Sequence, residues 1–329
     1  MAPAVTSSAA SPRAALEALA GRLERVGAQL TIEAPGGPPL RLGARPETAR
    51  VVFRDGAALV PLARGDHLAL AEAYLYGRID LGGDLAEVLK VTEVIALDES
   101  PWDRARVALG LLLRGRRAMN RDAIGFHYDR PPDFFLPWFE RWRSYSHGFW
   151  SGPGDDPSAA QERKMQHAID ALGLRAGQRV LDMGAGWGCF LEYAGLQGIR
   201  VHGITISEEQ HRFVEALIRE RDLPCSVERV DFFAYRPREP FDGAVFLGTL
   251  EHVADYGYAA RFLREHLRPG ARVYADFVAR RAGFRTGRFL SKWIWPGTTR
   301  YVDVAALLRA LGAQGFHVHE LVDDGLSYA

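Results

Sequence analysis

The second half of the chain alternates between short apolar runs and stretches with apolar residues at helical spacing. The apolar runs predict buried strands at Val180–Met183, Arg200–Ile206, Cys225–Val230, Phe241–Gly248 and Arg272–Asp276. Helical spacing lies between several of them, as in Glu208–Arg221 and Tyr258–His266. Because strands that alternate with helices form parallel sheets covered on both faces, we predict a Rossmann-like, doubly wound α/β sheet.

The first part of the chain has a different pattern. Residues 14–28 and 67–77 show helical spacing, and short strands are expected at residues 31–34, 40–42, 49–53 and 58–62. Turn-forming residues such as Pro35–Pro39 and Arg54–Gly56 separate these strands. We therefore predict a disordered tail over residues 1–12, a smaller α+β domain over residues 13–120, and the α/β domain over residues 121–329.

Composition and charge narrow the class of protein. Lys+Arg and Asp+Glu both number 41, so the formal net charge is zero and no overall attraction to nucleic acid is expected. Two cysteines, Cys189 and Cys225, argue against a disulfide scaffold and fit a reducing compartment. No apolar run is long enough for a transmembrane helix, and Met1–Pro12 lacks the pattern of a signal peptide. We expect a cytoplasmic protein without a metal site.

Three glycines at alternate positions follow the first predicted strand of the α/β domain. Gly184, Gly186 and Gly188 allow a tight turn in which the backbone comes close to a ligand, and a helix pattern begins at Cys189. A strand, a glycine loop and a helix form a nucleotide-type site at the carboxyl end of a parallel sheet. The G-x-G-x-G spacing differs from that of pyrophosphate-binding loops and favours a cationic nucleoside such as S-adenosylmethionine. Asp182, just before the loop, is placed to meet the ammonium or sulfonium side of that cofactor.

Polar and aromatic residues follow the next two predicted strands. Thr205, Ser207 and Gln210 can hydrogen-bond a ribose or an amino-acid moiety, and Ser207 can equally cap the helix that follows. Asp231 and Phe232 are placed to receive an adenine, with a carboxylate for its amino group and a ring on which to stack. These five residues are predicted to complete the cofactor site.

Glu251 comes just after the fourth predicted strand. The carboxyl end of a parallel strand is where ligands bind in this fold, so Glu251 is expected near the reacting methyl group. The alternative is a structural Glu–Arg pair, and the location favours the functional role.

Two segments combine arginines with apolar or aromatic residues. Arg104–Arg121 encloses the apolar run Val107–Leu113, and Arg280–Trp295 mixes cations with aromatic rings. Each fits a surface that rests on anionic lipid head groups. For Arg104–Arg121, a connecting helix with a solvated basic flank is the slightly favoured alternative. The aromatic-rich residues 127–150 fit either a core or a pocket lid.

Several of these motifs together resemble the cyclopropane fatty acid synthase and mycolic acid cyclopropane synthase family, whose members are S-adenosylmethionine-dependent enzymes. The resemblance runs from about His67 to Tyr328 and implies that the N-terminal α+β domain is lipid-binding-like. It is carried by Ala71–Gly77, His127–Asp129, Asp133–Phe135, Tyr145–Ser146, Val180–Gly188, Gly203–Gln210, Glu251–Val253 and Lys292–Gly297. The Gly-Trp-Gly motif followed by Thr-Ile-Ser-x-x-Gln is the most specific part. The resemblance implies that Tyr145, Ser146 and Trp187 close over the cofactor.

The chain departs from the family where the ring is closed. Typical members remove a proton with a bicarbonate ion that is held by Cys, Glu, His, Ile and Tyr residues. Here His147 takes the place of the cysteine and Asp276 that of the histidine, whereas Glu251 and Tyr328 match; the cysteine of the family's glycine loop is Ala185. An aspartate would repel bicarbonate. Use of bicarbonate therefore stays open: Asp276 or His147 can act directly as the base, or ring closure can be lost.

The resemblance predicts methyl or methylene transfer from S-adenosylmethionine to the cis double bond of an unsaturated acyl chain in a membrane phospholipid. The product is a cyclopropane or a methyl branch, and the protein is expected at the inner face of the membrane. One alternative is a C-methyltransferase for a soluble or carrier-bound metabolite, and another is a non-catalytic lipid- or cofactor-binding module. A homodimer stays open. Because family members continue beyond Tyr328, we expect a fragment.

Overall fold

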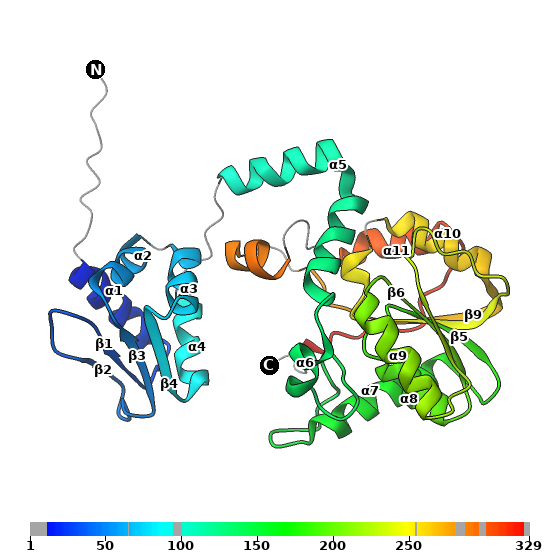
Figure 1. Cartoon of the computed structure of the whole chain (residues 1–329), viewed down its shortest axis with the longest axis horizontal. Helices are drawn as coiled ribbons and strands as arrows, with labels where there is room; N and C mark the ends of the chain where they lie inside the picture. Colours follow the sequence, from blue (N-terminus) through cyan, green and yellow to red (C-terminus); the bar gives the residue numbers. More distant parts are fainter. Residues whose placement is uncertain are drawn as a thin grey trace. The chain divides into compact units, whose positions relative to one another are not determined.

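A computed structural model of the chain describes residues 12–64, 66–94, 101–253, 255–280, 287–295 and 301–325 (Figure 1). The described residues form two compact units. The first contains those up to Ala108 together with residues 287–294, and the second contains those from Leu109 to residue 280 together with Trp295 and residues 301–325. The division falls inside the long helix α5 (Pro101–Tyr128), after Ala108 rather than at residue 120. The tail predicted over residues 1–12 lies outside the described residues up to residue 11, and Pro12 begins the first helix.

The first unit is a small α+β arrangement. Its four-stranded sheet has the order β2-β1-β3-β4, in which only the β1–β3 pair is parallel. The strands are β1 (Leu30–Glu33), β2 (Leu40–Leu42), β3 (Ala49–Phe53) and β4 (Ile79–Gly83), and the helices are α1 (Pro12–Arg25), α2 (Leu59–Arg64), α3 (His67–Leu75) and α4 (Leu85–Val94). Leu23 of α1 packs in one core with Leu30, Ile32 and Leu42 of the sheet. The sheet and helices therefore share one apolar layer.

The strand predicted over residues 58–62 is wrong, because these residues form helix α2 after a short 3₁₀ turn at Gly56–Ala58. Asp55 caps that turn, since its Oδ1 accepts a hydrogen bond from the Ala58 amide at 2.8 Å. Pro61 has no amide proton to give to a neighbouring strand. The fourth strand is β4 instead, which pairs antiparallel with β3.

The second unit contains a five-stranded sheet of order β7-β6-β5-β8-β9 in which every pair is parallel. The strands are β5 (Arg179–Met183), β6 (Arg200–Thr205), β7 (Ser226–Arg229), β8 (Phe241–Leu247) and β9 (Leu267–Asp276). This topology confirms the Rossmann-like, doubly wound fold predicted from the sequence. The chain runs outward from β5 to β7 and then returns to β8, so the order of strands reverses between β5 and β8. Ligands bind at such a switch point in open α/β sheets.

Helices cover both faces of this sheet (Figure 1). They are α7 (Pro157–Leu172), α8 (Cys189–Leu196), α9 (Glu208–Glu220), α10 (Tyr256–His266) and α11 (Val304–Gly312). Apolar residues of α7, α8 and α9 pack on one face, and Phe262, Leu263 and Leu307 of α10 and α11 pack on the other. Because side chains alternate along a strand, Val180 faces the first layer and Leu181 the second. The core therefore fixes which residues of the strand ends reach the switch point.

The two segments for which contact with lipid head groups was considered differ in their surroundings. In α5, Leu109, Leu112 and Leu113 are 54%, 81% and 72% exposed, and the helix bends at Gly115, which has a φ of 74°. In Arg280–Trp295, residues 281–286 lie outside the described residues. Lys292 and Trp293 both donate to Glu72 Oε1 of α3, at 2.6 and 3.0 Å. The α5 leucines are therefore displayed to solvent, whereas these two residues are engaged within the first unit.

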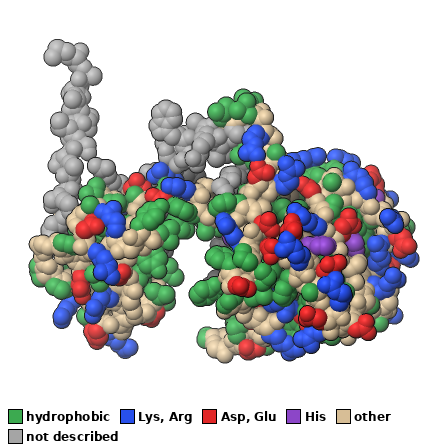
Figure 2. All heavy atoms as spheres, viewed as in Figure 1, with side chains coloured by type: hydrophobic (Ala, Val, Ile, Leu, Met, Phe, Trp, Pro, Cys, Tyr) green, Lys and Arg blue, Asp and Glu red, His purple; other side chains and the backbone are tan. Residues whose placement is uncertain are grey.

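Over the face of the second unit that Figure 2 shows, acidic and basic side chains lie interspersed. This arrangement agrees with the equal totals of 41 cationic and 41 acidic residues. Among the described residues, no helix combines the length and the apolar character that crossing a bilayer requires.

Candidate active site

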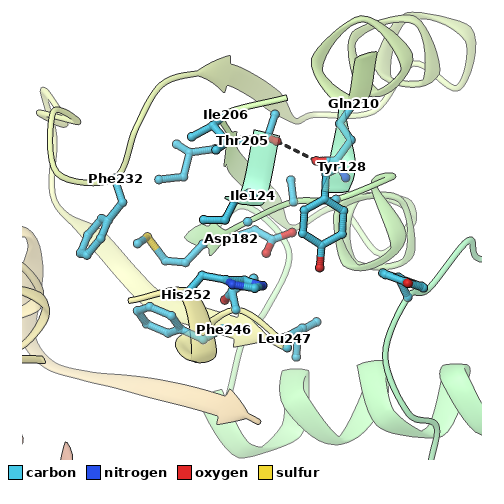
Figure 3. A pocket seen from close by; sticks show the side chains of 18 of the residues that line it. Ile124, Tyr128, Asp182, Thr205, Ile206, Gln210, Phe232, Phe246, Leu247 and His252 are labelled. Carbon is cyan, nitrogen blue, oxygen red and sulfur yellow. Dashed lines mark hydrogen bonds between the residues drawn. The ribbon is translucent and has the colours of Figure 1, made fainter. Parts of the chain in front are cut away.

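A cavity of about 190 Å³ opens at the carboxyl ends of the strands of the second unit. Its walls are the loops that follow β5, β6, β7 and β8, together with α5 and residues 143–146 after that helix. From α5, Asn120, Ile124 and Tyr128 reach the cavity at a spacing of four residues, which places them on one face of the helix. Figure 3 shows Tyr128 and Phe232 on opposite sides of this space, with Asp182 between them.

The glycine loop forms the turn that the sequence predicts. Gly184, Gly186 and Gly188 have φ angles of 95°, 52° and 81°, in the left-handed region that favours glycine. A Cβ on Gly184 would lie 2.4 Å from the Thr249 Cγ2. The loop can therefore pack this closely against Thr249 only because residue 184 has no side chain. Gly184 and Gly186 line the cavity, whereas Gly188 is the N-cap of α8 and lies outside the lining.

Asp182 is 2% exposed and lines the cavity from the end of β5. Burial raises the pKa of its carboxyl group to about 7, because a charged carboxylate loses hydration there. A cation bound beside Asp182 would favour the ionised form and lower this pKa. The residue is therefore suited to a cationic ligand, and its role in cofactor binding stays a prediction.

Thr205, Ser207 and Gln210 form one hydrogen-bonded unit at the end of β6. Thr205 Oγ1 donates to Gln210 Oε1 at 2.8 Å (Figure 3), and both residues line the cavity. Ser207 Oγ accepts from the Gln210 amide at 3.2 Å and is the N-cap of α9, but it lies outside the lining. The helix-capping role that the sequence left open for Ser207 is therefore present in the structure. Thr205 and Gln210 line the cavity instead of Ser207.

Asp231 and Phe232 line the cavity after β7. Asp231 Oδ1 accepts from the Phe233 amide at 2.8 Å, which fixes the carboxylate at the start of the loop. The Phe232 ring stands edge to face with Phe262, with a centroid distance of 5.0 Å. A rigid ring and a fixed carboxylate are the groups that are predicted from the sequence to bind the adenine of the cofactor.

The aromatic-rich residues that follow α5 form one wall of the cavity. Tyr145 stacks on His127 with a centroid distance of 5.6 Å, and its hydroxyl lies 3.2 Å from His127 Nε2. Tyr145, Ser146 and Trp187 all line the cavity. Trp187 is buried against Phe135, at a centroid distance of 5.7 Å. Tyr145 is 53% exposed, so this segment contains both packed and solvent-accessible aromatic residues.

Three of the predicted catalytic residues lie next to the cavity wall and outside its lining. Glu251 Oε1 accepts from the Val278 amide at 2.7 Å, and its buried Oε2 has no hydrogen-bond partner among the described residues. Burial raises the pKa of Glu251 to about 7. Asp276 Oδ1 accepts from the Gly248 amide at 2.6 Å. His147 has its pKa lowered by burial.

The fourth predicted catalytic residue, Tyr328, lies outside the described residues.

Sequence reasoning missed several residues of this site. Tyr128 and His252 line the cavity, and their rings meet edge to face at a centroid distance of 6.0 Å. Asn120 Nδ2 donates to the His252 carbonyl at 3.2 Å, which connects α5 to the loop after β8. Burial lowers the pKa of His252 to about 4, so this ring is neutral at physiological pH. The four-residue spacing of Asn120, Ile124 and Tyr128 was the signal that could have identified this helix face.

The donor and acceptor groups of the cavity fit a ligand with both polar and apolar parts. Among the described residues, the buried Thr249 Oγ1 and Trp187 Nε1 have no hydrogen-bond partner in the protein, and both residues line the cavity. Buried polar atoms are normally satisfied, so these two are suited to a ligand's polar groups. Ile124, Phe232 and Phe246 supply apolar surface in the same space.

A parallel sheet of this order with a glycine loop after its central strand defines the class of Rossmann-like methyltransferase folds. The solved structure of mycolic acid cyclopropane synthase CmaA1 complexed with SAH and CTAB has the same fold, with a TM-score of 0.55 at 23% identity, over 61% of this chain and 76% of that chain. The cyclopropane synthase MmaA2 from Mycobacterium tuberculosis gives 0.54 at 24% identity, over 61% and 76%.

The chain belongs to the mycolic acid cyclopropane synthetase family, whose sequence model matches residues 116–328. This match confirms the family inferred from the sequence motifs and the class of S-adenosylmethionine-dependent methyltransferases to which it belongs. Over 276 residues the chain is 27% identical to sphingolipid C9-methyltransferase B of Emericella nidulans, covering 79% of this chain and 54% of that protein.

Two further relatives match this chain over similar shares of its length. The chain is 26% identical to a probable fatty acid methyltransferase of Pseudomonas putida, over 78% of this chain and 67% of that protein. It is 27% identical to the cyclopropane-fatty-acyl-phospholipid synthase of Escherichia coli, over 70% and 61%. The chain thus spans only about half to two thirds of the length of these curated relatives.

Proposed function

We propose that the chain transfers a one-carbon unit from S-adenosylmethionine to the cis double bond of an unsaturated acyl chain. The observation that carries this proposal is the cavity itself, which joins Asp182, the glycine loop and Gln210 to aromatic surface from Tyr128 and Phe232. When bound, the cofactor supplies an electrophilic methyl group on a positively charged sulfur. The names of the relatives, which include fatty acid and sphingolipid methyltransferases, support an acyl substrate.

Each side of the cavity has a separate task in this proposal. Asp182 binds the cofactor's ammonium group, Thr205 and Gln210 bind its middle, and Asp231 with Phe232 binds its base. The buried aromatic rings exclude water and stabilise positive charge that develops on the alkene. The neutral ring of His252 does not oppose that charge, because burial keeps its pKa at about 4.

Glu251 is proposed to hold the proton that leaves the acyl chain. Its Oε1 is fixed by the Val278 amide, and its Oε2 has no partner among the described residues. A pKa of about 7 is suited to a base that works near neutral pH. Because Glu251 lies outside the cavity lining, the proton must reach it through a neighbouring group or a water molecule.

The residues around Asp276 do not fit a bicarbonate ion. The Gly248 amide donates to Asp276 Oδ1, and the buried ammonium of Lys164 lies 3.8 Å from Asp276 Oδ2. Both of these groups already serve the Asp276 carboxylate, and a second anion would be repelled. No step of the proposed reaction therefore uses bicarbonate. This observation favours a methyl-branched or methylene product as the second candidate beside the cyclopropane.

The α5 leucines support an encounter with a membrane surface. Leu112 and Leu113 are 81% and 72% exposed, and arginines flank them in the sequence. Exposed apolar side chains beside cations are the pattern of peripheral binding to anionic lipid. The proposed substrate is thus an acyl chain of a phospholipid, and a soluble or carrier-bound acceptor is the competing possibility.

The test is incubation of the protein with methyl-labelled S-adenosylmethionine and vesicles of unsaturated phospholipid. We expect label in the extracted lipid and a mass gain of one CH₂, with none in vesicles of saturated phospholipid. Resistance of the product to hydrogenation separates a ring from an alkene. Glu251→Gln is expected to abolish turnover while cofactor binding persists. Unlabelled lipid together with a labelled soluble acceptor would refute the phospholipid substrate.

A further inference from the structure

Lys164 of α7 is a completely buried lysine at 0% exposure, and it lies outside the lining of the cavity. Its ammonium donates to Ser146 Oγ at 2.6 Å and to the His147 carbonyl at 2.7 Å. The ion-pair partner is Asp276, whose Oδ2 lies 3.8 Å from Lys164 Nζ. Burying an ammonium is unfavourable, so a lysine in this place calls for a role beyond packing.

The hydrogen bonds of Lys164 determine how Ser146 faces the cavity. An ammonium has only donors, so Ser146 Oγ must accept from it. Ser144 Oγ lies 3.2 Å from Ser146 Oγ and 3.4 Å from Lys164 Nζ. Either serine hydroxyl can donate in the Ser144–Ser146 pair. When Ser144 donates, Ser146 keeps its own hydrogen for an acceptor in the cavity that it lines.

Asp276, the ion-pair partner of Lys164, binds a neighbouring part of the cavity wall. Asp276 Oδ1 accepts from the Gly248 amide at 2.6 Å, and Gly248 lines the cavity beside Ser146. The two are close, because a Cβ on Gly248 would lie 3.4 Å from the Ser146 Cβ. One buried ion pair therefore connects the segment before α7 with the end of β8.

Other residues of α7 also bind the segment before this helix, residues 144–149. Gln161 Nε2 donates to the Ser146 carbonyl at 2.8 Å, and the Phe149 amide donates to the Ala160 carbonyl at 3.0 Å. A Cβ on Gly148 would lie 2.8 Å from the Ala160 Cβ, which shows how closely the segment lies on the helix. The segment is thus held by the buried polar face of α7.

We infer that Lys164 is a positioning residue that, paired with Asp276, holds the Ser146 hydroxyl and the Gly248 backbone in the orientation needed to bind the cofactor. Lys164 touches neither cofactor nor substrate. It acts through Ser146, whose hydroxyl donates to an acceptor oxygen of the bound ligand. This inference rests on the proposed function for the identity of the ligand only.

Calorimetric binding of S-adenosylhomocysteine to four proteins tests the coupling: wild type, Lys164→Met, Ser146→Ala and the double variant. We expect Lys164→Met to weaken binding at least tenfold and the double variant to bind no more weakly than Lys164→Met alone. Effects that multiply would show that Lys164 does not act through Ser146, and binding within twofold of wild type would also overturn the inference. Lys90→Met is the matched control, because it removes a lysine–carboxylate pair with Glu87 in the first unit.

A second measurement needs no ligand. Hydrogen exchange of the free Lys164→Met protein should be faster at residues 144–149 and at Gly248 than in wild type, with the rest of α7 unchanged. Unchanged exchange at these amides, or a uniform increase along α7, would overturn the inference. Lys164→Met with Asp276→Asn should regain thermal stability without regaining affinity, because no buried carboxylate is left without its cation. Wild-type protein that fails to bind the probe would refute the proposed function, and the exchange rates would still decide the role of Lys164.

Discussion

At the scale of single residues, Asp182 and Glu251 are two buried carboxyl groups with similar pKa values and different surroundings. Burial raises both pKa values to about 7. Asp182 lines the cavity, whereas Glu251 lies outside the lining and holds the Val278 amide. Only Asp182 can therefore change its ionisation directly with a bound cation, which separates cofactor binding from proton acceptance.

Cofactor affinity is accordingly predicted to depend on pH through Asp182. The ammonium group of the ligand prefers the ionised carboxylate of Asp182, whose pKa is about 7. Affinity for S-adenosylhomocysteine should therefore fall by up to about tenfold for each pH unit below that value. Asp182→Asn should weaken binding at pH 8 and remove this dependence, as measured by calorimetry across pH. Glu251→Gln is the control and should keep the wild-type pH profile of binding. An unchanged profile in Asp182→Asn would show that another group controls the affinity.

At the scale of elements, the glycine loop and α5 form neighbouring walls of the cavity for different physical reasons. The loop could be predicted from its spacing, because three alternate glycines after a buried strand are typical of a tight turn that approaches a ligand. The four-residue spacing of Asn120, Ile124 and Tyr128 shows that they share one face of α5, but these are ordinary helix residues and their spacing does not show what that face packs against. Only the packing of α5 over the strand ends brings them to the site.

Gly184→Ala is predicted to disrupt the site more than an equivalent change elsewhere. It places a side chain at a φ of 95° and 2.4 Å from the Thr249 Cγ2. We expect at least tenfold weaker cofactor binding and a lower melting temperature. Gly270→Ala is the matched control, since Gly270 has a φ of 79° and no heavy atom within 4 Å of the added Cβ. That control should cost only about 1–2 kcal/mol of stability and leave binding unchanged. Equal effects of the two changes would argue against close packing at Gly184.

The exposed leucines of α5 predict a measurable contribution to membrane binding. Changing Leu112 and Leu113 together to serine should reduce co-sedimentation with anionic phospholipid vesicles by roughly tenfold or more, since each buried leucine contributes about 1.5–3 kcal/mol. Leu196→Ser on α8 is the control, because Leu196 is also exposed, at 56%. If the double variant sediments like wild type, these leucines do not contact the bilayer.

At the scale of the whole molecule, buried carboxyl groups and buried histidines act in opposite directions on stability. For Asp182 and Glu251 the folded pKa is raised, so their stabilisation is present at low pH and is lost as pH rises toward about 7. For His202 and His252 burial lowers the folded pKa to about 4, so stability is lost as pH falls from about 6.5 toward 4. These opposing contributions predict a nearly flat stability between pH 5 and 6.5.

Glu251→Gln should change this pH dependence of stability. At pH 7 the variant is expected to be more stable than wild type by roughly 1–3 kcal/mol, because a neutral amide replaces a carboxyl group that resists ionisation. At pH 5 the difference should be smaller, because the wild-type carboxyl group is then protonated in the fold. Thermal unfolding at the two pH values measures this, and a variant that is equally destabilised at both would indicate that the Val278 contact dominates.

The α/β alternation, the glycine loop and the polar residues after β6 and β7 could be identified from the chain alone, because strand period and glycine spacing are local properties. The same local information was misleading at residues 58–62, where a cap at Asp55 and a proline favoured a helix. It could not show that Gly188 and Ser207 lie outside the cavity lining, or that Lys164 is buried against Ser146 and Asp276. Those relations join residues that are far apart in the sequence, and only the packing of α5 and α7 against the strand ends decided them.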